Sequence, residues 1–260
     1  MPGEISGAKR GKILVVSHKS YCFPEDALYV PIRVGCAFEH STEGLLCDNT
    51  GENLSAKNNT FCELTALYWA WKNRFFDDAE YAGLVHYRRY FAGSFSFDGH
   101  QILSEIEIKQ FLRNCDVIVP KKRRYYIETV YDHYTHAHNG KDLDIIREII
   151  AVSVPEYLEA FDRTMQRRSL YLYNMFVMRT AWIYAYSEWL FPILFEAEKR
   201  IDTRRYDSYQ QRLFGFLAER LFNVWLLKNG LRIHEVKVVN LEGENLLKKG
   251  LLMLKRKFFG

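Results

Sequence analysis

Short apolar runs without alternation predict three buried strands, at Lys12–His18, Tyr81–Val85 and Asp116–Val119. A strand that is apolar on both faces is typical of a parallel sheet covered by helices on either side. Tyr29–Gly35 is a fourth extended segment. It contains Pro31, which cannot donate a ladder hydrogen bond, so we expect this segment at the edge of the sheet.

Apolar residues recur with helical spacing elsewhere. Thr60 and Glu63 have the spacing of a capping box, which predicts a helix that begins near Thr60 and ends near Lys72. Beyond residue 143 the pattern is mostly helical. Helices are expected at Asp144–Ile150, Pro155–Arg167, Ala181–Arg200 and Tyr209–Lys228.

This succession of strands and helices predicts one α/β domain, with a mainly parallel, Rossmann-like sheet and flanking helices. We expect a disordered N-terminus over residues 1–11, the domain over residues 12–240 and a basic amphipathic tail over residues 241–260. Within the domain, residues 12–120 form the sheet-based half and residues 121–240 a more helical half.

Composition narrows the class of protein. Hydrophobic residues make up 48% of the chain and aromatic residues 15%, as in a globular protein. The five cysteines are odd in number and have no CxxC spacing, and no signal peptide is apparent, so we interpret them as free thiols of a cytoplasmic protein. The most apolar stretch, Leu170–Phe195, is interrupted by Arg179 and Glu188, which argues against a membrane span.

The basic charge of the chain is local. The formal net charge is +4, and residues 246–260 hold five basic residues and no acidic one, so the rest of the chain is slightly acidic. A general nucleic-acid surface is therefore not expected. The apolar run Leu251–Leu254 with the basic run Lys255–Lys257 suits an anchor on anionic lipid at the inner face of the plasma membrane. A solvated helix end is the alternative.

Polar side chains are concentrated in the segment that follows residue 47. Asp48, Asn49, Asn53 and Lys57 lie close together there, and groups that donate and accept hydrogen bonds suit a polyhydroxylated ligand. Lys19 follows the first strand, and open α/β sheets bind ligands beyond the carboxyl ends of their strands. We therefore expect these five residues to bind a polyhydroxylated substrate, the donor of the reaction considered below.

His86, Arg88 and Arg89 follow the second buried strand. Adjacent guanidinium forks suit phosphate, so together with the polar segment they predict a nucleotide-sugar site. Alternation along an extended chain puts His86 and Arg88 on one face, where Arg88 would meet a diphosphate. Arg89 would brace the polar segment at Asp48 or Glu52. The alternative is that the arginines pair with carboxylates of the turn before the strand.

Long motifs carry a resemblance to a known family. The matching segments are Asp48–Ser55 (DNTGENLS), Cys62–Asn73 (CELTALYWAWKN) and His86–Phe91 (HYRRYF), with shorter matches at residues 174–178, 189–191 and 215–221. The chain resembles bacterial glycosyltransferases of capsular and exopolysaccharide synthesis, a family once filed as a domain of unknown function. The resemblance spans about residues 12–235. Cys47 and Glu52 depart from the family pattern, which more often has Gly and Asp there.

The resemblance implies a GT-A-like fold and a nucleotide-sugar-dependent hexosyltransferase, which we expect to be inverting. The expected donor is a UDP-sugar, such as UDP-galactofuranose or UDP-galactose. The expected acceptor is a lipid-linked glycan of capsular polysaccharide, exopolysaccharide or O-antigen synthesis. GT-A enzymes usually hold Mn or Mg with an Asp-x-Asp after a buried strand. Here residues 86–89 occupy that place, so fixed cations are expected to replace part or all of the metal's role.

An inverting transfer also needs a carboxylate that takes the proton of the acceptor hydroxyl. Glu219, in the motif at residues 215–221, is the first candidate. A structural ion pair with Arg220 is the alternative interpretation. Asp132 is the second candidate for the base.

Three histidines, His133, His136 and His138, follow in a polar segment. Their spacing matches no strong metal signature, so we predict no metal ligands and expect His138 to contact the donor. Asn174 and Tyr171 are expected to bind the acceptor. Asn174 is polar in an apolar run, so it needs a partner, which a backbone group would also supply.

A non-catalytic carbohydrate-binding or scaffold protein of the same assembly is the alternative function. It would account for the asparagine-rich segment but not for the adjacent Arg88 and Arg89 after a buried strand. Turnover of nucleotide sugars separates the two functions.

Overall fold

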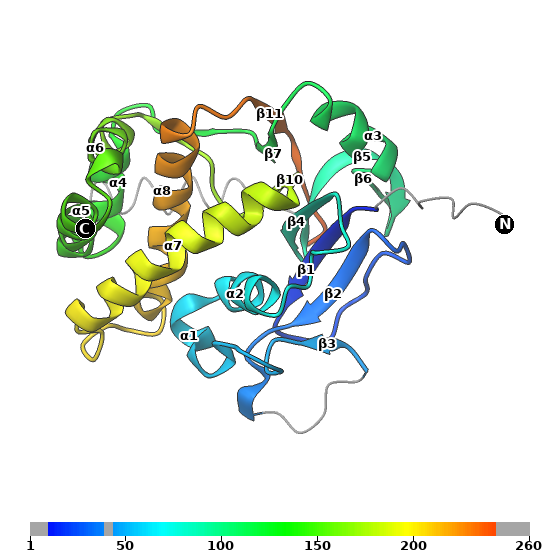
Figure 1. Ribbon diagram of the computed structural model, residues 1–260, viewed down its shortest axis with the longest axis horizontal. Coiled ribbons are helices and arrows are strands. Elements are labelled where there is room, and N and C mark those ends of the chain that lie inside the picture. The colour runs from blue at the N-terminus through cyan, green and yellow to red at the C-terminus, as the bar shows by residue number, and fades with distance from the viewer. Residues whose placement is uncertain (1–9, 39–43, 243–260) are drawn as a thin grey trace, which may run out of the picture.

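The structure, a computed structural model, describes residues 10–38 and 44–242 (Figure 1). The strands are β1 (Lys12–Ser17), β2 (Tyr29–Arg33), β3 (Leu46–Cys47), β4 (Tyr81–His86), β5 (Arg89–Phe97), β6 (His100–Ile102), β7 (Val117–Pro120), β8 (Arg123–Arg124), β9 (Ser169–Leu170), β10 (Phe176–Arg179), β11 (Ile233–Val236) and β12 (Val238–Asn240). The main sheet has the order β11-β7-β10-β4-β1-β2-β3. β5 pairs with β4 and carries β6 and β12, while β8 and β9 pair separately.

Eight α-helices lie in the described part of the chain. They are α1 (Asn58–Phe61), α2 (Leu64–Lys72), α3 (Glu105–Leu112), α4 (Val130–Ala137), α5 (Gly140–Ser153), α6 (Leu158–Met165), α7 (Thr180–Arg200) and α8 (Leu213–Lys228). Short 3₁₀ turns stand at Cys36–Phe38, Ser55–Lys57, Pro155–Tyr157 and Gln210–Arg212. The four helices expected beyond residue 143 are confirmed, with boundaries shifted by a few residues.

Parallel pairing dominates the part of the sheet formed by β1 to β4. β1, β2, β3 and β4 run parallel, so their carboxyl ends lie on the same edge. β10 is inserted antiparallel between β4 and β7. The predicted α/β sheet is confirmed, and β1, β4 and β7 lie where the apolar runs placed them. The hydrophobic pattern missed β10, because this strand lies within the longer apolar stretch from Leu170 to Phe195 and does not stand out there as a separate run.

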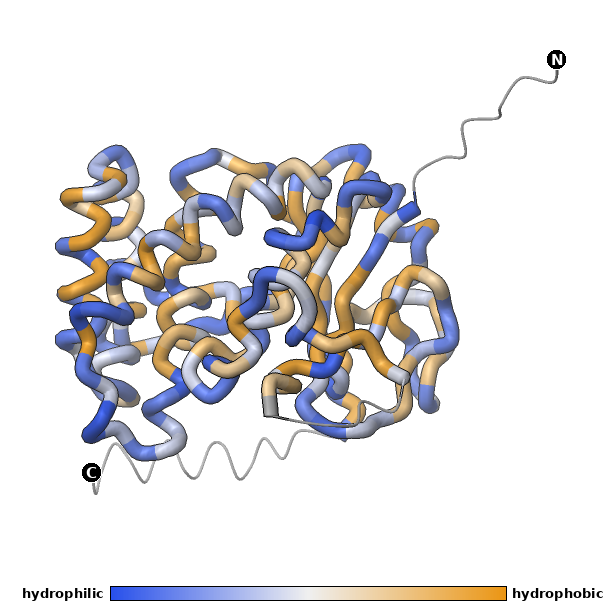
Figure 2. The backbone as a smooth tube through the Cα atoms, turned by 60° about the horizontal axis from the view of Figure 1, so that its bottom comes forward, coloured by the Kyte–Doolittle hydropathy of each residue, from blue (hydrophilic) through white to orange (hydrophobic). Residues whose placement is uncertain are grey.

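The sheet separates two apolar cores. On one face α2, α7 and α8 pack against residues such as Leu14, Leu84 and Phe176, and α4, α5 and α6 lie beyond α8 (Figure 1). On the other face α3, β5 and β6 cover residues such as Val15 and Val85. Figure 2 shows the apolar runs along the central strands and mixed hydropathy along the helices, as expected for buried strands and amphipathic helices.

The prediction that Tyr29–Gly35 forms an edge strand is wrong, because β2 lies between β1 and β3. The reason that Pro31 is tolerated is the shortness of β3. Only Ile32 and Arg33 pair with β3, so the pairing starts one residue after the proline. Pro31 is paired with Val15 of β1 on the other side.

The predicted capping box is also wrong. The helix is broken at Cys62, whose φ is +51°, so α1 ends at Phe61 and α2 begins at Leu64. The hydroxyl of Thr60 donates to the carbonyl of Lys57, and Glu63 makes no capping hydrogen bond. The break turns Glu63 away from the helix start, toward the site described below.

No helix among residues 10–38 and 44–242 is both long enough and apolar enough to cross a bilayer. The stretch from Leu170 to Phe195 instead contains the strand β10 and most of α7, whose inner side packs on the sheet. The expected lipid anchor at residues 246–260 lies outside the described residues.

Candidate active site

The parallel strands bring polar residues to one edge of the sheet. His18 and Lys19 follow β1, Arg33 ends β2, Asp48 follows β3 and His86 ends β4. The registers of β1 with β2 and with β4 align these strand ends. This is the edge at which open α/β sheets bind ligands.

β4 and β5 form a tight hairpin through the two-residue turn Tyr87-Arg88. His86 is paired with Arg89 across this turn. Directly paired residues project to the same face of a sheet, so the predicted grouping of His86 with Arg88 is wrong. The alternation assumed one continuous strand, and the missed strand β5 reverses the chain instead.

Two cations converge on one carboxylate beside the hairpin. Arg88 Nη1 lies 2.9 Å from Glu242 Oε2, and Lys19 Nζ lies 3.6 Å from Glu242 Oε1. The hydrogen bond from Arg88 is the main cause of the lowered pKa of Glu242. Ion pairs this exposed contribute little to stability, so an anionic ligand can take the place of the carboxylate.

Arg89 lies deeper in the same region. Its guanidinium carbon is 4.9 Å from the centre of the Tyr173 ring, and its buried Nε has no hydrogen-bond partner among the described residues. The expectation that it braces Asp48 or Glu52 is wrong. The carboxylate of Asp48 accepts hydrogen bonds from the backbone N–H groups of Gly35 and Cys36, just after β2, and that of Glu52 accepts one from the hydroxyl of Tyr68.

The electrostatic environment at the strand ends is positive. The pKa of His18 is lowered, first by burial and then by the charges of Lys19, Arg88, Arg212 and Arg33. These cations come from four separate segments of the chain. They make the edge a favourable place for a diphosphate.

A strained turn lies opposite the hairpin. Tyr173 and Asn174 have φ values of +77° and +48°, in the left-handed region that side chains usually avoid. Each such residue costs on the order of 1–3 kcal/mol, and strain of this kind gathers at functional sites. The turn leads directly into β10, so it is held against the centre of the sheet.

Three ionisable side chains from three elements hold this turn. His86 Nε2 lies 2.6 Å from the Tyr173 carbonyl oxygen, and the Tyr173 N–H donates to Glu219 Oε1 at 2.7 Å. Asn174 Nδ2 donates to Glu63 Oε1 at 2.6 Å and to a carbonyl of α8. The turn therefore joins β4, α8 and the start of α2 in one polar cluster.

Glu219 is a partly exposed carboxylate of this cluster. Its side chain is 16% exposed, and Arg220 Nη1 lies 2.9 Å from Oε2. Burial raises the pKa of Glu219 above its ordinary value, although Arg220 and the Tyr173 N–H act in the opposite direction. A carboxylate with a raised pKa is a stronger base, and the ion pair with Arg220 is present as well.

The polar side chains after β3 are held by hydrogen bonds within their own segment, by the chain that follows β2 and by α7. Asp48 is fully buried and accepts hydrogen bonds from two backbone N–H groups and from Ser55. Asn49 donates to the Cys36 carbonyl, and Asn53 binds within its own turn. Lys57 pairs with Glu198 of α7 at 2.7 Å. Their expected contact with the donor stays a prediction.

Asp132, the second candidate base, has a structural contact instead. It caps α4, because its Oδ2 accepts from both the N–H and the hydroxyl of Thr129. These hydrogen bonds lower its pKa, which makes it a weaker base. The geometry therefore favours Glu219 over Asp132.

The three histidines after Asp132 point to different neighbours. His133 stacks on Tyr125, and His136 Nδ1 lies 3.0 Å from the carboxylate of Glu128. His138 Nδ1 binds Gln210, and its ring stacks on Phe216 at 4.2 Å, one helical turn before Glu219. His138 thus lies beside α8, and its role toward the donor stays a prediction.

The expected acceptor residues lie near the turn. Tyr171 is buried, and its hydroxyl donates to Glu235 at 2.8 Å. Asn174 is 2% exposed, and its buried Oδ1 lacks a hydrogen-bond partner in the described part of the chain. Asn174 donates to a backbone carbonyl, the alternative partner considered from the sequence, and also to the carboxylate of Glu63, which was not expected. Its expected contact with the acceptor stays a prediction.

Divalent metals need several oxygen or nitrogen ligands in one place. The described residues contain no group of three or more His, Cys, Asp or Glu side chains that could hold a metal ion. The strand end after β4 presents arginines, which repel a cation. The strand end after β4 thus holds fixed positive charge at the place where an Asp-x-Asp was expected.

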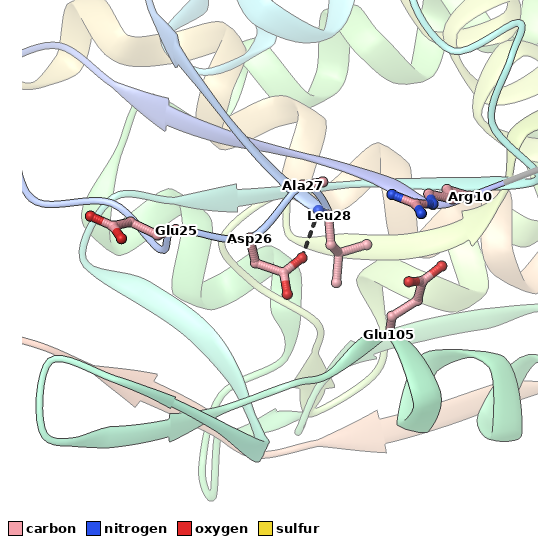
Figure 3. A pocket seen from close by; sticks show the side chains of 7 residues that line it. Arg10, Glu25, Asp26, Ala27, Leu28 and Glu105 are labelled. Carbon is pink, nitrogen blue, oxygen red and sulfur yellow. Dashed lines mark hydrogen bonds between the residues drawn. The ribbon is translucent and has the colours of Figure 1, made fainter.

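A pocket opens at the opposite edge of the sheet (Figure 3). It lies at the amino ends of β1 and β2 and is lined by Arg10, Asp26, Leu28 and Glu105, among others. Asp26 accepts a hydrogen bond from the backbone of Leu28 there. This pocket is separated from the strand ends that carry His86 and Lys19, so it is not part of the candidate site.

Sequence reasoning missed Glu63, Tyr173 and Arg212. Glu63 was assigned to a helix cap, although it stands in the CELTALYWAWKN motif. Arg212 donates to Cys62 Sγ at 3.4 Å and contributes to the charge around His18. Nothing in the local pattern marks Tyr173, because its role depends on its backbone conformation.

Comparison with solved structures gives one substantial likeness. The chain is 32% identical to the bifunctional glycosyltransferase WbbM in its apo structure, with a TM-score of 0.80 over 90% of this chain. The match covers 46% of WbbM, so the chain spans about half the length of that protein. The likeness confirms the expected GT-A-like α/β fold.

A second solved structure, the mannosyltransferase Ktr4p from S. cerevisiae, is 10% identical, with a TM-score of 0.35 over 91% of this chain and 72% of Ktr4p. A score this low carries no argument. No curated protein matches the chain. A family model described as a domain of unknown function, DUF4422, matches residues 12–230, so the chain belongs to the DUF4422 family.

Proposed function

We propose that this protein is a glycosyltransferase that moves a sugar from a nucleotide diphosphate sugar to an acceptor hydroxyl. The observation that carries this proposal is the position of Glu219. This half-buried carboxylate with a raised pKa stands across a strained turn from a basic strand end. The likeness to WbbM over 90% of the chain supports the same reaction class.

The leaving diphosphate needs positive charge as its bond to the sugar breaks. Lys19 and Arg88 supply it from the strand ends, where Glu242 marks the position of an anion. Arg89 adds a guanidinium whose Nε has no partner among the described residues. Because these cations stand where an Asp-x-Asp was expected, we assign the leaving-group charge to these side chains.

Glu219 takes the proton of the acceptor hydroxyl. The hydroxyl oxygen forms a bond to the anomeric carbon while the bond from that carbon to the diphosphate oxygen breaks. The electron pair leaves with the nucleoside diphosphate, and the proton stays on Glu219. Attack from the face opposite to the diphosphate inverts the configuration of the sugar.

The finer assignment follows the sequence resemblance. The donor is a UDP-sugar, with UDP-galactose and UDP-galactofuranose first to be tested. The acceptor is a lipid-linked glycan of capsular polysaccharide, exopolysaccharide or O-antigen synthesis. An anionic membrane surface would bind the basic tail and keep the enzyme near such an acceptor.

A screen of nucleotide sugars tests the proposal. A donor that binds the native state raises the melting temperature, and its transfer releases nucleoside diphosphate. The expected result is a shift with one nucleotide sugar and its slow hydrolysis, which Glu219→Gln abolishes. Binding of glycans without any release of nucleoside diphosphate would instead support a non-catalytic carbohydrate-binding protein.

A further inference from the structure

The distance between His86 and Tyr173 fixes the orientation and the tautomer of the histidine. His86 Nε2 lies 2.6 Å from the Tyr173 carbonyl oxygen. A carbonyl oxygen only accepts hydrogen bonds, so Nε2 carries the proton. A ring turned over would place Cε1 at that position, and 2.6 Å is too short for a C–H···O contact, which needs about 3.3–3.6 Å.

The other ring nitrogen is left as an acceptor. Nδ1 of His86 has no hydrogen-bond partner among the described residues, and it is not one of their fully enclosed polar atoms. Burial lowers the pKa of His86, and Arg89 and Arg88 lower it further, against the opposing effects of Glu63 and the Tyr173 carbonyl. The neutral ring therefore presents a lone pair at Nδ1.

We propose that Nδ1 of His86 accepts a hydrogen bond from a hydroxyl group of the nucleotide-sugar donor. The proposal rests on the proposed function, because it needs a hydroxylated ligand at the ends of β1 and β4. A phosphate oxygen is itself an acceptor, so a neutral Nδ1 disfavours it and selects a group that donates. His86 thus accepts a hydrogen bond from a hydroxyl of the donor, while Arg88 and Lys19 bind its diphosphate.

The location agrees with this division of roles. His86 is the last residue of β4, and the hairpin turn places Arg88 two residues further on. The hydroxyls of a sugar nucleotide lie on both sides of its diphosphate, on the ribose and on the transferred sugar. The carbonyl of the strained turn holds the imidazole in place, so Nδ1 is oriented before the ligand arrives.

Two substitutions separate the two nitrogens. In His86→Gln the amide nitrogen can occupy the place of Nε2 and donate to Tyr173, but the acceptor at Nδ1 is lost. In His86→Asn the amide oxygen can occupy the place of Nδ1, but the bond to Tyr173 is lost. We expect His86→Gln to weaken binding of the UDP-sugar selected in the screen by at least about tenfold, with an unchanged melting temperature. His86→Asn should keep most of the affinity and melt at a lower temperature.

Calorimetric titration with UDP and with that UDP-sugar locates the hydroxyl. If His86→Gln weakens the binding of both ligands, the hydroxyl belongs to the ribose. If it weakens only the binding of the UDP-sugar, the hydroxyl belongs to the transferred sugar. Wild-type affinity in His86→Gln, or a greater loss in His86→Asn, would overturn the role of Nδ1 and leave the proposed function intact. A wild-type protein that binds no nucleotide sugar would overturn the proposed function, and the role of His86 with it.

Discussion

Asn174 Nδ2 lies 2.6 Å from Glu63 Oε1, so a residue just before β10 is joined to the start of α2 across 111 positions of sequence. The same amide donates to the carbonyl of Gly215 in α8. One buried side chain therefore ties together three elements that border the candidate site.

Loss of this amide should destabilise the fold. We expect Asn174→Ala to lower the free energy of unfolding by about 2–4 kcal/mol, because Glu63 and a carbonyl lose their donor and alanine is strained at this φ. Asn174→Gly also lacks the amide donor but relieves the backbone strain, so it should destabilise the protein by about 1 kcal/mol less than Asn174→Ala. Urea titration measures the free energy of unfolding of both variants. Asn53→Ala, within an exposed turn, is the control, and an equal effect there would contradict the assignment.

Glu219→Gln should remove the base and keep the shape. Turnover is expected to fall at least about a hundredfold, with donor affinity nearly unchanged, because glutamine still accepts the Tyr173 N–H but cannot take a proton. Steady-state release of nucleoside diphosphate and calorimetric donor binding measure the two quantities. Asp132→Asn is the rival variant. Near-normal turnover in Glu219→Gln with a collapse in Asp132→Asn would move the role to Asp132.

The raised pKa of Glu219 predicts opposite trends of activity and stability with pH. Its native pKa lies above the unfolded value because burial disfavours the charge. As the pH rises from the unfolded pKa through the native pKa, the native state holds more protons, so this group's contribution to stability falls. Over the same window kcat/KM should rise, because the base ionises. In Glu219→Gln both trends should disappear. A stability that instead rises with pH through Glu219 would contradict the assignment.

Arg88→Lys keeps the charge but loses the planar fork. We expect kcat/KM to fall at least about tenfold, because a bidentate contact with the diphosphate is lost. EDTA should leave most of the wild-type activity. Arg232→Lys is the matched control, since Arg232 makes a forked pair with Asp116 away from the site. Complete loss with EDTA, restored by Mn or Mg, together with a mild Arg88→Lys effect, would return the leaving-group role to a metal.

Truncation after Asn245 tests the expected lipid anchor. The shortened protein should remain folded and should no longer sediment with phosphatidylglycerol vesicles at low salt, because five basic residues are removed. A full-length variant with those five residues changed to glutamine should behave in the same way. Equal sedimentation of all three proteins would rule the anchor out.

Local pattern was enough for much of the fold. The apolar runs located β1, β4 and β7, and helical spacing located the helices beyond residue 143, because burial on one or both faces leaves a periodic mark on consecutive residues. The same reasoning put His86, Arg88 and Lys19 at strand ends, since parallel strands end on one edge. The resemblance to a known family, through the motif at residues 215–221, singled out Glu219.

The meeting of distant residues was decided only by the tertiary structure. The hairpin at Tyr87-Arg88 reversed the expected grouping of His86 and Arg88, and the left-handed turn at Tyr173-Asn174 brought Glu63, His86 and Glu219 together. Neither feature leaves a periodic signal. Each depends on which strands lie side by side and on a backbone conformation that packing sustains against its strain. Sequence by itself therefore determined the central buried strands and the later helices, and the fold decided which of their side chains meet to form the candidate site.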